Sequence, residues 1–256
     1  MGKSEIPIVI GGFYRSGTSL VRRLLDSHSH IHCGPEVKFF KDFYGDYLDD
    51  PLASGRFFST ARTYGLPNSD LLAIFGSAFV EFHERAAANT GKQRWADKNP
   101  ENVIFLEGWQ TLLPNGFVFI HVVRHPLDTL ASLKEARFPR AVPAAFPEKA
   151  RMYLRFRETG EAYCRAHSET AFVIGYEDLV TAPEPTLRRL FAFLDEPYEP
   201  QVLNLFNSPE RRTGIEDPKV AHTQNVHSDS VGRWLRDLTD DEIASGQEIL
   251  RSFLDD

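Results

Sequence analysis

The sequence has few cysteines, no excess of basic residues and no long apolar run. Its two cysteines, Cys33 and Cys164, cannot form a disulfide framework and are typical of a reducing, cytoplasmic location. A formal net charge of −7 argues against a general surface for nucleic acid. No run approaches the roughly 18 apolar residues of a membrane span, and the N-terminus lacks a signal-peptide core. We therefore expect a cytoplasmic protein that binds neither nucleic acid nor membrane.

Apolar runs and amphipathic stretches alternate along the 256 residues. Strands are expected at 6–11, 94–98, 116–124 and 171–177. Helices are expected at 17–27, 70–88, 99–113, 126–136, 147–167 and 185–196. This alternation predicts an α/β fold, a three-layer, P-loop-like domain with a central parallel sheet flanked by helices. We expect residues 1–256 to form this single domain.

The stretch IVIGGFYRSGTSLVRRLLDSH, residues 8–28, lacks a residue that a Walker loop requires. Gly12 and Gly17 have the Walker spacing, but Thr18 stands where the lysine should follow. Arg15 is the only cation between the two glycines. Because the lysine that reaches the terminal phosphates is missing, the loop is poorly suited to a triphosphate with magnesium.

What the loop does contain fits a different phosphate-like group. Its backbone N–H groups open a helix, where the macrodipole favours negative charge. The residues that supply these N–H and hydroxyl donors are Ser16, Gly17, Thr18 and Ser19. Arg15 adds a planar fork suited to two oxygens of one anion. A strand–helix turn without a ligand is the plain alternative.

Polar residues follow the predicted strands where each strand ends. They are Arg15, Lys98, Arg124 and Tyr176. Ligands of parallel sheets bind beyond the carboxyl ends of the strands. The sequence therefore predicts that three cations gather at one edge of an acidic protein.

Two segments resemble the PAPS-dependent sulfotransferases, whose donor is 3′-phosphoadenosine 5′-phosphosulfate (PAPS). FYRSGTSLVRRLLDSHSHIHCGPE, residues 13–36, is similar to their 5′-phosphosulfate loop, and most similar to that of tyrosylprotein sulfotransferases and their bacterial relatives. FIHVVRHPLDTLASL, residues 119–133, carries the family's arginine with a serine eight residues later. The resemblance covers most of the chain. It implies sulfuryl transfer from PAPS, release of adenosine 3′,5′-bisphosphate (PAP), and no requirement for a metal.

The resemblance also implies roles for individual residues. The donor-binding set is Arg15, Ser16, Gly17, Thr18 and Ser19 at the 5′-phosphosulfate, Arg124 and Ser132 at the 3′-phosphate, and Tyr176 near the nucleotide. Arg15 and Lys98 are expected to stabilise the leaving phosphate, where Thr223 matches a family serine. Glu36 matches the proposed catalytic base, and Lys38 matches a basic residue at the substrate.

Several of these residues have alternative interpretations. His32 is a rival base, since many sulfotransferases use histidine. Tyr176 could serve packing alone, and Arg124 could pair with Asp128 in place of a phosphate. Arg211 and Arg212 either meet the 3′-phosphate or are solvated, and the sequence does not separate the two.

Two segments without a clear period, 39–70 and 205–230, are expected to shape the acceptor pocket and a lid. The aromatics of the first segment suit an apolar acceptor or a small satellite core; they are Phe39, Phe40, Phe43, Tyr44, Phe57 and Phe58. The expected acceptor is a small molecule or a peptide that offers a hydroxyl or an amine. Two other functions stay open, a P-loop kinase or NTPase and a non-catalytic nucleotide-binding relative.

Overall fold

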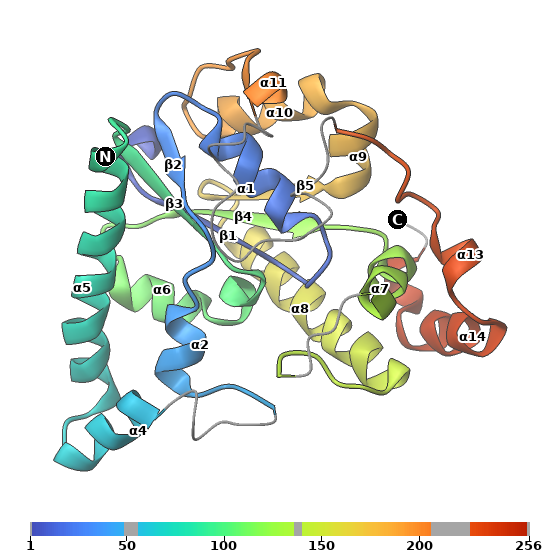
Figure 1. Ribbon diagram of the computed structural model, residues 1–256, viewed down its shortest axis with the longest axis horizontal. Helices are drawn as coiled ribbons and strands as arrows, with labels where there is room; N and C mark the ends of the chain where they lie inside the picture. Colours follow the sequence, from blue (N-terminus) through green and yellow to red (C-terminus); the bar gives the residue numbers. More distant parts are fainter. Residues whose placement is uncertain (1, 49–55, 136–139, 206–225, 255–256) are drawn as a thin grey trace.

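A five-stranded parallel sheet forms the centre of the protein in this computed structural model, which describes residues 2–48, 56–135, 140–205 and 226–254 (Figure 1). The strands are β1 (Ile8–Gly12), β2 (Ile31–Cys33), β3 (Arg94–Lys98), β4 (Val118–Val123) and β5 (Ala171–Gly175). Their order is β2-β3-β1-β4-β5, and every neighbouring pair is parallel. The predicted α/β fold with a central parallel sheet is confirmed.

The side chains of the central strands alternate between two buried layers. In β1, Ile8 and Ile10 join one apolar cluster, whereas Val9 joins the other. Ile120 and Phe119 of β4 divide in the same way. Because both faces of a parallel sheet are covered, these strands read as continuous apolar runs.

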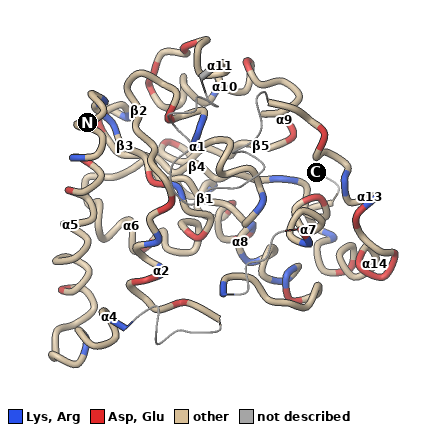
Figure 2. Tube along the Cα trace, in the orientation of Figure 1, with Lys and Arg blue, Asp and Glu red and all other residues tan. Residues whose placement is uncertain are grey.

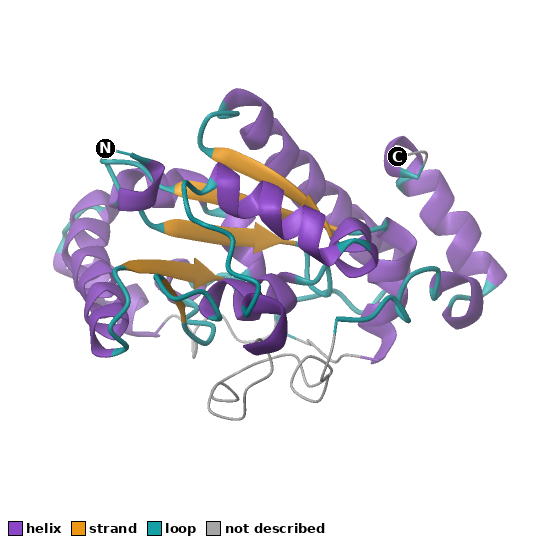
Figure 3. Ribbon diagram, turned by 90° about the horizontal axis from the view of Figure 1, so that it is seen from above, coloured by secondary structure: helices purple, strands orange, loops and turns teal. Residues whose placement is uncertain are grey.

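Helices cover both faces of the sheet, as Figure 3 shows with helices in purple around strands in orange. The cluster on the Ile10 side includes residues of α1 (Thr18–Asp26), α9 (Tyr176–Thr181), α10 (Pro183–Phe193) and α11 (Val202–Leu205). The cluster on the Val9 side includes residues of α2 (Phe39–Tyr44), α5 (Asn68–Asn89), α6 (Leu106–Leu112) and α8 (Phe146–Ala166). None of the described helices is both long and apolar enough to cross a bilayer.

Eight further helical elements complete the described part of the chain. They are η1 (Lys3–Glu5), α4 (Arg56–Ala61), η2 (Arg62–Tyr64), η3 (Pro100–Ile104), α7 (Pro126–Glu135), α13 (Trp234–Asp237), α14 (Asp240–Ile249) and η5 (Arg251–Phe253). Asp128 of α7 accepts hydrogen bonds from the backbone N–H of Gly232 at 2.8 Å and of Trp234 at 3.0 Å. These bonds tie the C-terminal segment to the carboxyl edge of the sheet.

Three elements differ from those expected. Strand β2 was not among the predicted strands, because three residues at a sheet edge carry no measurable period. The helix expected at 99–113 is divided into η3 and α6. The Asn102 amide donates to the carbonyl of Ile10 at 3.0 Å and holds the η3 turn against β1. Strand β5 ends at Gly175, and Tyr176 begins α9.

Candidate active site

The loop between β1 and α1 is shaped around Gly17. This glycine has φ +98°, and a Cβ there would lie 2.6 Å from Cδ2 of Tyr176. Arg15 also has a positive φ, +67°. Helix α1 begins at Thr18, so its first N–H groups point toward the loop. The loop therefore presents a helix N-terminus that is closely packed against a tyrosine ring.

Four predicted donor-binding residues meet on one side of this loop. Arg15 Nε donates to Ser132 Oγ at 3.1 Å. Arg124 Nη1 donates to the carbonyl of Arg15 at 3.1 Å, and its guanidinium lies 4.4 Å from the centre of the Tyr176 ring. Residues that follow β1 and β4, a residue of α7 and the first residue of α9 after β5 thus converge, as expected for strand ends at one edge.

Arg124 is buried to 5% exposure, and burial lowers its pKa. Its Nη2 donates to the carbonyl of Ser230 at 2.5 Å. Its Nε is buried and has no hydrogen-bond partner within the described ranges. Asp128 makes its hydrogen bonds to the C-terminal segment. The guanidinium therefore keeps a donor in a place where an anion would satisfy it.

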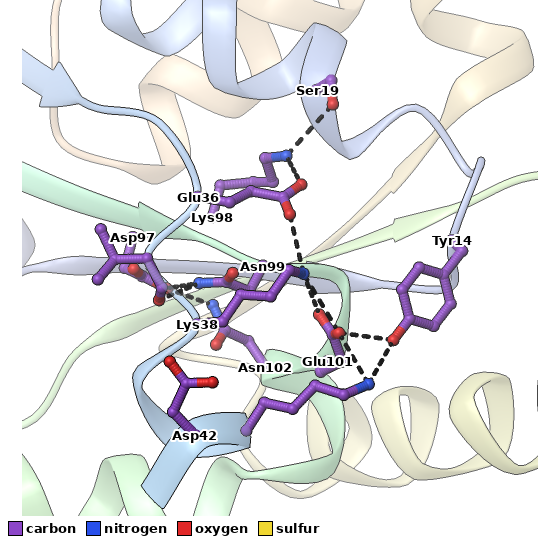
Figure 4. A network of polar contacts seen from close by, with 12 residues as sticks. Tyr14, Ser19, Glu36, Lys38, Asp42, Asp97, Lys98, Asn99, Glu101 and Asn102 are labelled. Carbon is purple, nitrogen blue, oxygen red and sulfur yellow. Dashed lines mark hydrogen bonds and ion pairs between the residues drawn. The ribbon is translucent and has the colours of Figure 1, made fainter. Parts of the chain in front are cut away.

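Lys98, Glu36 and Lys38 form a second group, which meets Ser19 at the start of α1 (Figure 4). Lys98, only 1% exposed, donates to Ser19 Oγ at 3.2 Å and forms an ion pair with Glu36 Oε1. Lys38 Nζ lies 2.9 Å from the other oxygen, Glu36 Oε2. The structure thus places the expected base between two ammonium groups.

This second group continues into residues that the sequence analysis missed. Lys38 Nζ is 3.3 Å from both oxygens of Glu101, and Lys41 Nζ is 3.2 Å from Glu101 Oε1. The Tyr14 hydroxyl donates to the same Oε1 at 2.5 Å. Weak signals were present, because Tyr14 adjoins Arg15 and Glu101 lies three residues after Lys98.

The charges of this network reinforce one another. Burial opposes the charged form of Lys38, but Glu101 and Glu36 together raise its pKa. Burial likewise opposes the Glu101 carboxylate, but Lys38 and Lys41 lower its pKa. Burial and Glu101 raise the pKa of Tyr14, which keeps its hydroxyl protonated. Each charged group is stabilised by its neighbours.

His32 lies apart from this group, in the edge strand β2. Its Nδ1 is 3.6 Å from Asp26 Oδ1, and burial lowers its pKa. The charged side chains that act on it are Asp26, Lys92, His83 and Arg22. Within the described ranges, no three His, Cys, Asp or Glu side chains are close enough to hold a metal ion. Thr223, Arg211 and Arg212 lie outside the described residues.

The aromatic residues of segment 39–70 divide between core and surface. Phe39 stacks on Phe79 at 4.5 Å between ring centres, and Phe40 packs edge-on against Trp109 at 4.9 Å. Phe57, in contrast, is 63% exposed. The first aromatics of the segment therefore belong to the apolar cluster on the Val9 side of the sheet.

Comparisons with known proteins agree on one family. Residues 7–200 match the sulfotransferase family. A protein-tyrosine sulfotransferase of Drosophila melanogaster is 24% identical over 257 residues, which are 96% of this chain and 50% of that protein. The sulfotransferase domain of the Synechococcus PCC 7002 olefin synthase has a similar fold, with a TM-score of 0.65, 19% identity and coverage of 96% and 94% of the two chains. A mouse sulfotransferase complexed with PAP gives a TM-score of 0.52 at 14% identity, covering 97% of this chain and 84% of that one.

Proposed function

The chain belongs to the sulfotransferase family and is an enzyme of sulfuryl transfer, and we propose that PAPS is its donor and PAP its product. The observation that carries this proposal is the cluster of Arg15, Ser132, Arg124 and Tyr176 beside a glycine loop without a Walker lysine. PAPS carries two separate anionic groups, the 3′-phosphate and the 5′-phosphosulfate. The chain has two corresponding groups of donors, Arg124 with Ser132 and the loop between β1 and α1.

The donor would be held at both ends by groups that are already in place. Arg124 and Ser132 would bind the 3′-phosphate, and the buried Nε of Arg124 supplies an unused donor for it. The loop N–H groups and the hydroxyls of Thr18 and Ser19 would bind the 5′-phosphosulfate. The Tyr176 ring fixes the guanidinium plane of Arg124 by a cation–π contact.

Transfer itself needs positive charge at the leaving group and a base at the acceptor. PAPS supplies the activated sulfuryl group; the acceptor oxygen or nitrogen bonds to sulfur as the bond from sulfur to the 5′-phosphate oxygen breaks. Lys98 and Arg15 would stabilise the charge that grows on that oxygen, and losing one such donor typically lowers the rate about 10²–10³-fold. Glu36 would accept the proton of the acceptor.

The acceptor is proposed to be a small molecule or a peptide that carries a hydroxyl or an amine. Lys38, which is next to Glu36 and has a side chain 26% exposed, would contact it. Two observations favour Glu36 over His32 as the base. Glu36 pairs with Lys98 at the carboxyl edge of the sheet, whereas His32 pairs with Asp26 at the end of α1.

Calorimetric titration with PAP, with ATP plus magnesium in parallel, tests the donor. We expect micromolar or tighter binding of PAP and a loss of at least about 100-fold in Arg124→Ala, because a charge-assisted contact to phosphate is removed. Arg155→Ala is the matched control, since Arg155 is exposed on α8, and it should bind PAP normally. Preference for ATP with magnesium would support a kinase and overturn the proposal.

Labelled PAPS with a panel of phenols, amines and tyrosine peptides tests catalysis. We expect transfer in the native chain and a loss of at least about 100-fold in Glu36→Gln. Intact PAP binding without any transfer across the panel would favour the non-catalytic alternative.

A further inference from the structure

Five charged side chains form a row in which the sign of the charge alternates. In order they are Lys98, Glu36, Lys38, Glu101 and Lys41, of which Figure 4 labels the first four. The side chains of Glu36 and Lys38 are 13% and 26% exposed, whereas those of Lys98, Glu101 and Lys41 are 1%, 4% and 6% exposed. The row is thus accessible at Glu36 and Lys38 in its middle and buried on both sides of them.

Lys38 is shared between the two carboxylates. Its Nζ is 2.9 Å from Glu36 Oε2 and 3.3 Å from each oxygen of Glu101. Glu101 is held on its other side by Lys41 at 3.2 Å and by the Tyr14 hydroxyl at 2.5 Å. Because these two donors are buried, Glu101 is held in place, whereas Lys38 is the most exposed member of the row.

Two ammonium groups bonded to a carboxylate favour its charged form, so Glu36 accepts a proton more readily if one of these contacts weakens. Lys98 is 1% exposed and also bonds Ser19, so it is held in place. Lys38 already contacts both carboxylates, so it can release Glu36 and keep its hydrogen bonds to Glu101. A buried charge pair adds little net stability, so stability alone gives a weak reason for placing Glu101 here.

We propose that Glu101 is a positioning residue that sets how firmly Lys38 holds Glu36, and that it receives Lys38 when the acceptor proton moves to Glu36 Oε2. This inference rests on the proposed role of Glu36 as the base. Lys41 and Tyr14 act one step further away, because they fix Glu101. The charged and titratable groups of the row that act on Glu36 come from four parts of the chain: Lys98 of β3, Lys38 and Lys41 at α2, Glu101 of η3 and Tyr14 of the loop.

The test is the pH titration of Glu36, followed by carbon-13 NMR of protein labelled at the glutamate side-chain carboxyls, with the Glu36 signal identified by its loss in Glu36→Gln. Without Glu101, Lys38 has Glu36 as its remaining partner in the row. The midpoint should therefore move down by about one pH unit in Glu101→Gln. The matched control is Glu107→Gln, an exposed glutamate six residues away, which should leave the midpoint unchanged.

A double-mutant cycle shows whether the effect passes through Lys38. Lys38→Met should raise the Glu36 midpoint, and adding Glu101→Gln to that variant should lower it by less than in the native protein, because only the direct repulsion between the two carboxylates is then removed. An equal shift in both backgrounds, or no shift in Glu101→Gln, would overturn the proposal. Lys41→Met gives a second measurement should Glu101→Gln fail to fold. It should raise the midpoint, because Glu101 then draws Lys38 toward itself, and a fall would contradict the mechanism.

The titration uses the protein without PAPS, so its result is separate from the donor assignment. If PAP does not bind, the proposed function fails while the coupling between Glu101 and Glu36 can still be measured. If PAP binds and the coupling is absent, only the present inference fails.

Discussion

Single residues at the carboxyl edge gain their roles from neighbours far away in the sequence. Arg124 follows β4, yet the groups it contacts are the Arg15 carbonyl, the Ser230 carbonyl and the Tyr176 ring. Its own backbone carbonyl accepts from the Tyr153 hydroxyl at 2.7 Å. The main chain and the guanidinium are both fixed, which reduces the conformational entropy lost when an anion binds.

His121 makes the stability of the fold sensitive to acid. This residue of β4 is 1% exposed, and its ring lies so close to Gly160 that a Cβ there would meet His121 Nε2 at 2.4 Å. Burial, assisted by the charge of Arg157, lowers its pKa from 6.5 to about 3. The folded protein therefore keeps the ring neutral over a range in which the unfolded chain protonates it.

The sign of the effect follows from this difference in pKa. Above pH 6.5 both states are neutral and His121 adds no pH dependence. As the pH falls from 6.5 toward 3, the unfolded state gains the proton first, so the free energy of unfolding decreases by an amount on the order of a few kcal/mol. Denaturant unfolding of His121→Leu should show a shallower decline over this range. The control His227→Leu, at an exposed histidine, should follow the native curve, and identical slopes for all three proteins would contradict the prediction.

At the scale of elements, the loop between β1 and α1 depends on one close approach. Gly17 lies against the Tyr176 ring, which in turn carries the guanidinium of Arg124. The same glycine therefore sets both the start of α1 and the position of a cation from another strand. Glycine is required at position 17 because its φ is positive and because a Cβ there would collide with the Tyr176 ring.

Replacing Gly17 with alanine should weaken PAP binding at least about tenfold. The new Cβ would lie 2.6 Å from the Tyr176 ring and would displace Arg124 with it. The positive φ adds a loss of about 1 kcal/mol in stability. Gly116→Ala is the matched control, since Gly116 has φ +95° with nothing within 4 Å of a Cβ. It should lose similar stability and bind PAP normally in calorimetry, and equal affinity in both variants would refute the steric argument.

At the scale of the whole molecule, the sequence predicted the sheet and one edge of it well. Buried parallel strands appear as apolar runs, and residues at their carboxyl ends must meet, so Arg15, Lys98 and Arg124 could be placed from their positions alone. Figure 2 shows basic and acidic residues mixed along the chain, so overall charge gives no such guidance.

The buried row of charges could not be predicted in this way. Lys41 and Glu101 look like ordinary surface residues in the sequence, and their burial depends on α2 packing beside η3. The short strand β2 could not be recognised from the sequence either. Only its pairing with β3 identifies it as a strand, because its residues show no period. These features depend on tertiary contacts between segments more than fifty residues apart in the sequence.

Binding of PAP should raise the thermal stability of the whole domain. The proposed contacts join the loop after β1, the end of β4, α7 and α9, so the ligand would bind only when these elements are assembled. At a PAP concentration about 100 times the dissociation constant, linkage adds about 2.7 kcal/mol to the free energy of unfolding. For a chain of this size that corresponds to a rise in melting temperature of about 5–10 °C. Scanning calorimetry over a PAP series measures it, with Arg155→Ala expected to keep the rise and Arg124→Ala to lose most of it. A rise of the same size in Arg124→Ala would place the bound nucleotide elsewhere on the molecule.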